Sequence, residues 1–110
     1  MSGNSGTDEF DYAFDSAFFK VLSEPARLEI LRFVALNGEC DISRIAGEFP
    51  QDRSVISRHL KQLADAGFLE TERRSRHTYY RVNGGEFLNR LEDMTLRVKE
   101  LIRECDELLE

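Results

Sequence analysis

The sequence predicts one small, mainly α-helical domain of the α+β class with a single β-hairpin. Its 110 residues are the size of one compact domain, and the apolar residues, 41% of the chain, can form one modest core. Apolar side chains recur every three or four positions over most of the chain, as they do in amphipathic helices. Two short runs, residues 68–73 and 78–82, alternate apolar and polar side chains instead, which is typical of strands.

The first two expected helices are apolar and should build the core. The first begins at about Glu9 and carries an aromatic stripe at helical spacing. The stripe consists of Phe10, Phe14 and Phe18. The second helix starts near Pro25, a residue tolerated in a first helical turn, and ends at Gly38. Because its apolar side chains lie on most sides, we expect it to be the buried central helix.

Two shorter helices follow, separated by only a few residues. Asp41 caps the first of them and Pro50 ends it, whereas the second covers about residues 53–66 between Asp52 and Gly67. The inward stripe of the second helix consists of Ile56, Leu60 and Leu63. Its opposite, polar face consists of Ser54, Arg58, Lys61 and Asp65.

A hairpin and a long helix complete the chain. Residues 74–77 (Arg-Ser-Arg-His) form a basic tip between the two alternating runs, and a helix runs from about Glu86 to the C-terminus. The apolar seam of this helix alternates spacings of four and three and consists of Phe87, Leu91, Met94, Val98, Leu101, Cys105 and Leu108. Such a seam favours a partner helix. We expect the first helix, or the same elements of a second copy, to cover it.

Charge is distributed unevenly along the chain. The total of 15 Lys and Arg against 21 Asp and Glu gives −6, which by itself argues against a nucleic-acid partner. Residues 51–82, however, carry seven basic and four acidic side chains, whereas residues 1–19 and 83–110 are each net −4. Screening limits the reach of a charge to about 8–10 Å. The sign of the charge close to a phosphate therefore determines whether a surface docks on it. The central segment is basic and can do so.

Several classes of protein are excluded by the composition. No run approaches the roughly 18–20 apolar residues of a membrane helix, and the polar, acidic start is unlike a secretory signal. Two cysteines, 65 positions apart, are too few for a disulfide-stapled scaffold, so we expect a cytoplasmic protein. Residues 1–8 are expected to form a disordered acidic tail, and residues 9–110 a single domain.

Catalytic motifs are absent from the sequence, so we do not expect an enzyme. There is no G-x-S-x-G, Walker loop, H-E-x-x-H or C-x-x-C. Ser57 and His59 are two positions apart on a helix, so they point in different directions and do not form a dyad.

The two short helices indicate a helix-turn-helix, and the hairpin that follows indicates a wing. In such a unit the second helix enters the major groove, and the neighbouring ribbon reaches the backbone or a groove. This requires short polar or guanidinium side chains near the start of that helix. Suitable residues are Arg53, Ser54, Ser57 and Arg58, with Lys61 further along the same face.

The segments LSEPARLEILRFVALNGE and SVISRHLKQLADAGFLETERRSRHTYYRV resemble the ArsR/SmtB-type winged-helix transcriptional repressors. The matching patterns are L-x-x-P-x-R-L-x-I-L, then S-x-x-S-R-H-L-x-x-L-x-x-A-G, then a wing that ends in Y-Y-R, together covering about residues 18–83. The resemblance implies a cytoplasmic homodimer that represses its target and releases double-stranded operator DNA when an effector binds. The first and last helices would form the dimer surface.

The resemblance also implies roles for individual residues. The recognition-helix contacts would be Arg53, Ser54, Ser57, Arg58 and His59, and the wing contacts Arg74, Arg76 and His77. The dimer interface would include Phe10, Phe14, Phe18, Phe87, Leu91, Met94, Val98 and Leu101. Alternatively, His59 packs beneath its helix and His77 is simply solvated.

The sequence does not identify the effector. Asp41 and Ser43 occupy the positions of a metal-binding Cys-x-Cys pair in many family members, and the last helix contains no His, so we expect no metal and no cofactor. Cys40 and Cys105 are either small buried residues or a thiol switch that senses an oxidant, a persulfide or a thiophilic metalloid. Alternatives are a regulator that binds a non-thiol small molecule and a winged-helix protein-interaction module without operator binding.

Overall fold

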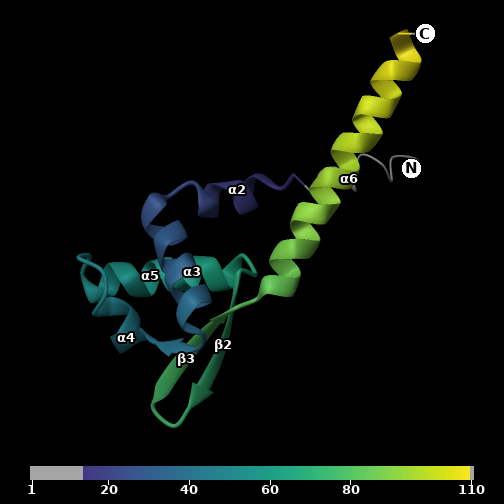
Figure 1. Ribbon diagram of the computed structural model, residues 1–110. Helices are drawn as coiled ribbons and strands as arrows, with labels where there is room; N and C mark the ends of the chain where they lie inside the picture. The colour runs from purple at the N-terminus through teal and green to yellow at the C-terminus, as the bar shows by residue number, and fades with distance from the viewer. Residues whose placement is uncertain (1–13, 110) are drawn as a thin grey trace, which may run out of the picture.

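The computed structural model describes residues 14–109, in which a helical body carries a small sheet and a long C-terminal helix (Figure 1). The elements are α2 (Ser16–Leu22), α3 (Pro25–Asn37), β1 (Cys40–Asp41), α4 (Ile42–Ala46), α5 (Arg53–Asp65), β2 (Leu69–Arg74), β3 (His77–Val82) and α6 (Gly84–Leu109). A helix-turn-helix (α4 and α5) is followed by a hairpin wing (β2 and β3). This order confirms the predicted winged helix-turn-helix of mainly α class.

The core forms where α3 packs against α5 and the sheet. Pro25 stands in the first turn of α3, and the Glu24 carboxylate caps this turn by accepting from the Ala26 N–H at 3.4 Å. The predicted inward stripe of α5 is confirmed, because all three of its residues are fully buried. The core consists of Phe18, Ile30, Leu31, Val34, Cys40, Ile45, Ile56, Leu60, Leu63, Phe68, Leu69 and Met94.

The sheet has three strands rather than the two expected from the sequence. Its order is β1-β3-β2, with both pairs antiparallel. Strand β1 pairs Cys40 with Tyr80 and Asp41 with Tyr79. Two residues are too few to show a period in the sequence, and their partners are remote in the chain, so only the folded structure defines this strand.

Two helix boundaries differ from the expectation. The prediction of one continuous helix from Glu9 to Leu22 is wrong, because the backbone of Asp15 is extended (φ −62, ψ 123). The Asp15 carboxylate caps α2 by accepting from the Ala17 N–H at 3.1 Å. The earlier part of that helix and the expected tail, residues 1–13, lie outside the described residues. Helix α4 ends at Ala46, so Phe49 lies in the turn before α5.

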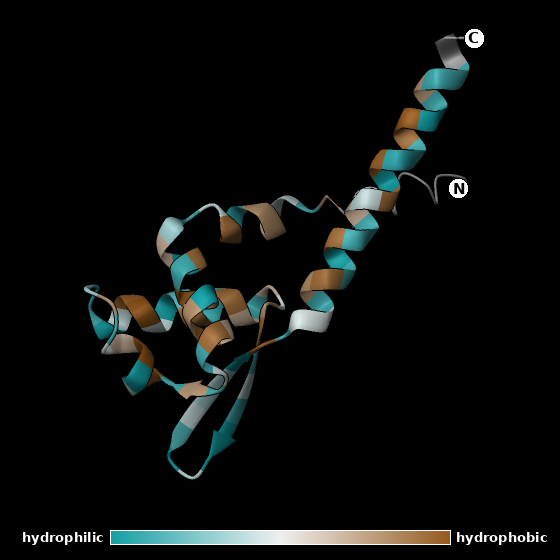
Figure 2. Ribbon diagram, viewed as in Figure 1, coloured by the Kyte–Doolittle hydropathy of each residue, from teal (hydrophilic) through white to brown (hydrophobic). Residues whose placement is uncertain are grey.

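Helix α6 begins on the body and then extends away from it (Figure 1). The Asn83 side chain caps it by accepting from the Glu86 N–H at 3.3 Å, and the Phe87 ring packs on Phe68 with centroids 5.1 Å apart. Figure 2 shows apolar residues recurring along most of its length. Within residues 14–109, no helix combines the length and the hydropathy of a membrane span.

Candidate nucleic-acid interface

The outer face of α5 carries the side chains that the sequence analysis assigned to DNA. The exposed residues on it are Arg53, Ser54, Ser57, Arg58 and Lys61. Arg53 donates to the Ser43 hydroxyl of α4 at 3.2 Å, which links the two helices of the helix-turn-helix. Arg58 forms no hydrogen bond or ion pair with another described residue. All of its N–H donors are therefore available to a partner outside the described residues.

Two other candidate DNA contacts on α5 are less available to DNA. Lys61 pairs with Asp65 at 3.1 Å, although both side chains are well exposed, and such surface pairs contribute little to stability. His59 is half-buried on the flank of the helix, and its Nδ1 is a buried atom without a hydrogen-bond partner in the structure. The structure thus places His59 beside the exposed face rather than on it.

The wing tip is a two-residue turn between β2 and β3. Ser75 takes φ 56, a left-handed conformation that favours glycine, whereas the following Arg76 does not. Arg73 and Arg76 are exposed and have no partner among the described residues. His77 Nδ1 lies 3.7 Å from Asp41 Oδ2. The tip therefore offers two uncompensated guanidinium groups.

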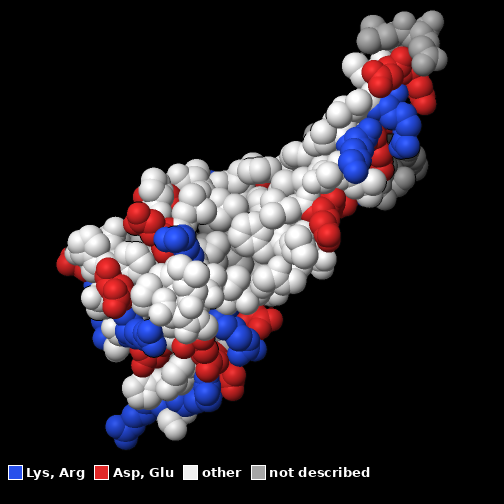
Figure 3. All heavy atoms as spheres, in the orientation of Figure 1, with Lys and Arg blue, Asp and Glu red and all other residues white. Residues whose placement is uncertain are grey.

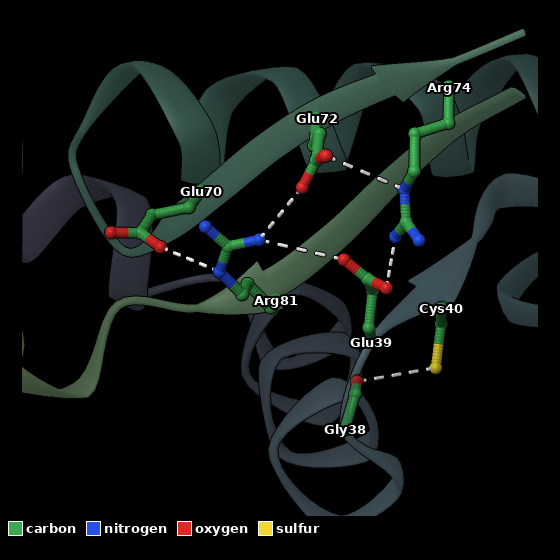
Figure 4. Close-up of polar contacts among 7 residues, drawn as sticks. All are labelled: Gly38, Glu39, Cys40, Glu70, Glu72, Arg74 and Arg81. Carbon is green, nitrogen blue, oxygen red and sulfur yellow. Dashed lines mark hydrogen bonds and ion pairs between the residues drawn. The ribbon is translucent and has the colours of Figure 1, made fainter.

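A cluster of five charged residues lies where the wing meets the body, and we call it the wing root: Glu39, Glu70, Glu72, Arg74 and Arg81 (Figure 4). Arg74 pairs with Glu39, and its Nε lies 3.7 Å from Glu72 Oε2. Arg81 Nε donates to Glu70 at 2.8 Å, and its Nη1 lies 3.4 Å from Glu72 and 3.5 Å from Glu39. The hydrogen bonds to Glu39 and to Glu70 raise the pKa values of Arg74 and Arg81, respectively.

Arg74 therefore differs from the other expected DNA contacts. The resemblance made it a wing contact, but the structure turns its guanidinium toward Glu39 and over the Tyr79 ring, 4.1 Å from the ring centroid. Its charge is compensated within the chain. The arginines of α5 and the wing that have no carboxylate partner among the described residues are Arg53, Arg58, Arg73 and Arg76, and we call this set the DNA face. Figure 3 shows basic side chains projecting at the wing tip, at the bottom of the view.

The two cysteines lie far apart within the chain. Cys40 is 2% exposed, its thiol lies 3.6 Å from the Gly38 carbonyl oxygen, and burial raises its pKa. Cys105 is exposed near the distal end of α6, remote from β1 (Figure 1). A switch that joins these two thiols within one chain does not fit this arrangement. No group of three or more His, Cys, Asp or Glu side chains within the described residues could hold a metal ion.

The apolar residues expected at a dimer interface divide into two groups. Phe18 (3% exposed) and Met94 (9%) belong to the core of the single chain, whereas Phe14 and Phe87 are half-buried. The exposed apolar residues of α6 are Leu88, Leu91, Leu96, Val98, Leu101 and Ile102. A groove of about 440 Å³ on this helix is lined by Phe14, Leu91, Met94, Thr95, Val98 and Lys99. Phe10 lies outside the described residues.

Sequence reasoning gave no role to two residues that organise the site. Arg27 donates to the Val21 carbonyl at 2.7 Å and to Gln62 Oε1 at 2.7 Å, so it ties α2 and α3 to α5. Its place in the L-x-x-P-x-R-L pattern was the only signal. No signal in the sequence pointed to Glu39, because its partners, Arg74 and Arg81, follow 35 and 42 positions later.

A helix-turn-helix and wing that expose uncompensated arginines define a winged-helix DNA-binding regulator. The chain belongs to the ArsR family: the model of the family described as "Bacterial regulatory protein, arsR family" matches residues 24–71. An uncharacterized HTH-type transcriptional regulator from Methanocaldococcus jannaschii is 31% identical over 97 residues, which are 88% of this chain and 97% of that protein.

Two further similarities agree with this family. The arsenical resistance operon repressor of Bacillus subtilis is 35% identical over 71 residues, which are 62% of this chain and 65% of the repressor. A homodimeric winged helix-turn-helix DNA-binding domain from Mycobacterium bovis, a possible ArsR-family transcriptional regulator, has a solved structure with a TM-score of 0.65 and 26% identity. That match covers 100% of this chain and 94% of the domain. The expected family is confirmed.

Proposed function

We propose that this chain is a homodimeric, sequence-specific repressor that binds operator DNA and releases it when an effector binds. Family membership establishes a transcriptional regulator; the proposal adds the contacting residues, the dimer and release by an effector. Its place of action is the cytoplasm, where operator DNA lies.

One observation carries the proposal: arginines without carboxylate partners occur both on α5 and at the wing tip. Arg58 and Arg76 have no partner among the described residues. Free guanidinium groups can pair with phosphates or read guanine edges, and a winged helix-turn-helix brings its second helix and its wing to one duplex. The proposed contacts are Arg53, Ser54, Ser57, Arg58, His59, Lys61, Arg73, Arg76 and His77.

The uncovered apolar face of α6 favours a dimer. Leu91, Val98 and Leu101 are 43%, 42% and 48% exposed in the single chain. A seam of this kind on a terminal helix favours association with a second copy. The related domain from Mycobacterium bovis is homodimeric. Two-fold symmetry would present two recognition helices to successive major grooves.

DNA binding tests the proposal directly. The probe is fluorescein-labelled DNA from the region upstream of the chain's own gene, and fluorescence anisotropy at fixed salt gives the Kd. We expect Arg58→Ala to weaken binding by about tenfold or more with unchanged thermal unfolding, because it removes one to two charge-assisted bonds worth roughly 1–3 kcal/mol. Arg32→Ala, the same change at an exposed α3 arginine, is the control. Equal Kd values for Arg58→Ala and wild type would indicate a protein-interaction module instead.

Thiol chemistry is one form of effector response. The separation of Cys40 from Cys105 restricts it to single cysteines or to a contact between two copies. If Cys105 senses oxidants, hydrogen peroxide weakens DNA binding by the wild type and not by Cys105→Ser. An equal response of the variant would exclude Cys105 as the sensor and favour a non-thiol small-molecule effector.

A further inference from the structure

The outer surface of the wing sheet carries a bridging carboxylate that the proposed DNA contacts do not use. Glu39 immediately precedes β1, and its two oxygens pair with different arginines: Oε1 with Arg74 Nη2, and Oε2 with Arg81 Nη1 at 3.5 Å. Arg74 belongs to β2 and Arg81 to β3. One carboxylate therefore joins the body to both strands of the wing (Figure 4).

This bridge reaches further along the wing than the backbone pairing does. Strand β1 pairs with β3 only at Tyr79 and Tyr80, and it does not pair with β2. Arg74 is the last residue of β2, directly before the turn that carries Arg76. A two-stranded ribbon twists strongly and is marginally stable on its own, so its tip depends on side-chain support. The pair of Arg74 with Glu39 supplies that support beside the tip.

Packing and charge keep the arginines of the wing root in place. The Arg74 guanidinium lies over the Tyr79 ring, a favourable cation–π arrangement. Arg81 is held by Glu70 at 2.8 Å as well as by Glu39. The wing root contains three carboxylates and two guanidinium groups, so it is net negative and offers DNA no positive charge.

We infer that Glu39 is a positioning residue for DNA binding: through Arg74 and Arg81 it orients the wing so that Arg76 and the recognition helix engage the same duplex. The inference rests on the proposed function. It predicts an effect opposite in sign to that of simple electrostatics. Removing a carboxylate close to DNA would by itself strengthen attraction to phosphates, whereas loss of the bridge weakens binding.

Glu39→Gln tests the inference, because it keeps the shape of the side chain and removes its charge. We expect DNA affinity, measured by anisotropy at fixed salt, to fall about threefold to tenfold, as for the loss of two surface ion pairs. The thermal midpoint should change little. Glu29→Gln makes the same change at an exposed α3 carboxylate with no partner among the described residues, and it should bind DNA like the wild type.

A double-mutant cycle with Arg76→Ala distinguishes positioning from a general effect on the fold. If Glu39 acts through the wing tip, Arg76→Ala weakens binding less in the Glu39→Gln background than in the wild type. Unchanged or tighter binding by Glu39→Gln overturns the inference, and so does an Arg76→Ala effect of equal size in both backgrounds. If the wild type binds DNA no better than Arg58→Ala, the proposed function itself fails, and the inference fails with it.

Discussion

The DNA face and the wing root are two arginine-containing regions that differ in what surrounds their guanidinium groups. On the DNA face, Arg58 and Arg76 have no carboxylate partner among the described residues. In the wing root, Arg74 pairs with two carboxylates and Arg81 with three. Arg74 and Arg76 are separated by one residue, yet they belong to different regions.

This difference shows that a charge count along the chain does not say which basic side chains are available to DNA. Residues 51–82 are net +3, and the two arginines Arg74 and Arg81 among them are paired with carboxylates of the chain. Part of the compensation comes from Glu39, which lies outside the segment. A carboxylate that accepts from a guanidinium occupies the donors a phosphate would otherwise use. We therefore propose that the DNA face binds DNA and that the wing root orients the wing.

Removing two arginines from each region is the strongest test of this comparison. Arg58→Ala combined with Arg76→Ala should weaken DNA binding about a hundredfold and lower the slope of log K against log salt by about two, one unit for each lost phosphate contact. Arg74→Ala combined with Arg81→Ala should weaken binding about tenfold or less and leave the slope unchanged, because these arginines release no counterions. The measurement is anisotropy from about 50 to 300 mM salt. Equal slopes for the two double variants would contradict the division.

A smaller effect is expected at Cys40, the buried core residue that follows Glu39 in the chain. Burial raises the pKa of this thiol above its ordinary value of 9.0. The folded chain therefore holds the proton more tightly than the unfolded chain. This tighter proton binding contributes to the free energy of unfolding. The contribution is complete below about pH 9 and is lost as the pH rises through the raised pKa.

Urea unfolding at about pH 8 and pH 10 measures this loss. Cys40→Ala costs about 1–2 kcal/mol at the lower pH, because it removes a buried sulfur from the core. Its free energy of unfolding should then fall less steeply with pH than that of the wild type. Cys105→Ala, at an exposed position, is the control and should follow the wild type. Parallel pH profiles for all three proteins would exclude a role of the buried thiol.

The smallest expected effect is at the wing tip of the DNA face. Ser75 takes φ 56, which costs a non-glycine residue about 1 kcal/mol. Ser75→Gly removes this cost but makes the unfolded chain more flexible, so we expect a net gain of about 0.5 kcal/mol in the free energy of unfolding. DNA affinity should stay within about twofold, because the substitution leaves all the arginines of the DNA face in place. A loss of stability in thermal unfolding would contradict this account of the turn.

Much of the fold could be predicted because its determinants are local. The spacing of Ile56, Leu60 and Leu63 identified the buried face of α5, and all three are fully buried. Asp41 caps α4 as expected, accepting from the Arg44 N–H at 3.0 Å. The break at Asp15 was missed because the aromatic stripe continues through it and hides the cap.

The candidate site was predictable in its parts and not in its contacts. The sequence identified Arg58 and Arg76, because a polar helix face and a basic hairpin tip are visible in neighbouring residues. It did not separate Arg74 from them, and it gave no role to Glu39. The pairing of these two residues arises from the three-stranded sheet, which brings together positions 35 apart in the chain.

The sequence alone predicts the helices, the hairpin, the family and the basic segment. These features follow from periodicity, caps and motifs, which depend on residues close together in the chain. Folding determines which arginines pair with carboxylates, which apolar residues of α6 remain uncovered, and that Cys40 and Cys105 lie apart. These features depend on distant segments that meet only in the folded chain. The sequence does not distinguish an arginine beside a carboxylate from one beside solvent, but only the second is free to attract a DNA phosphate.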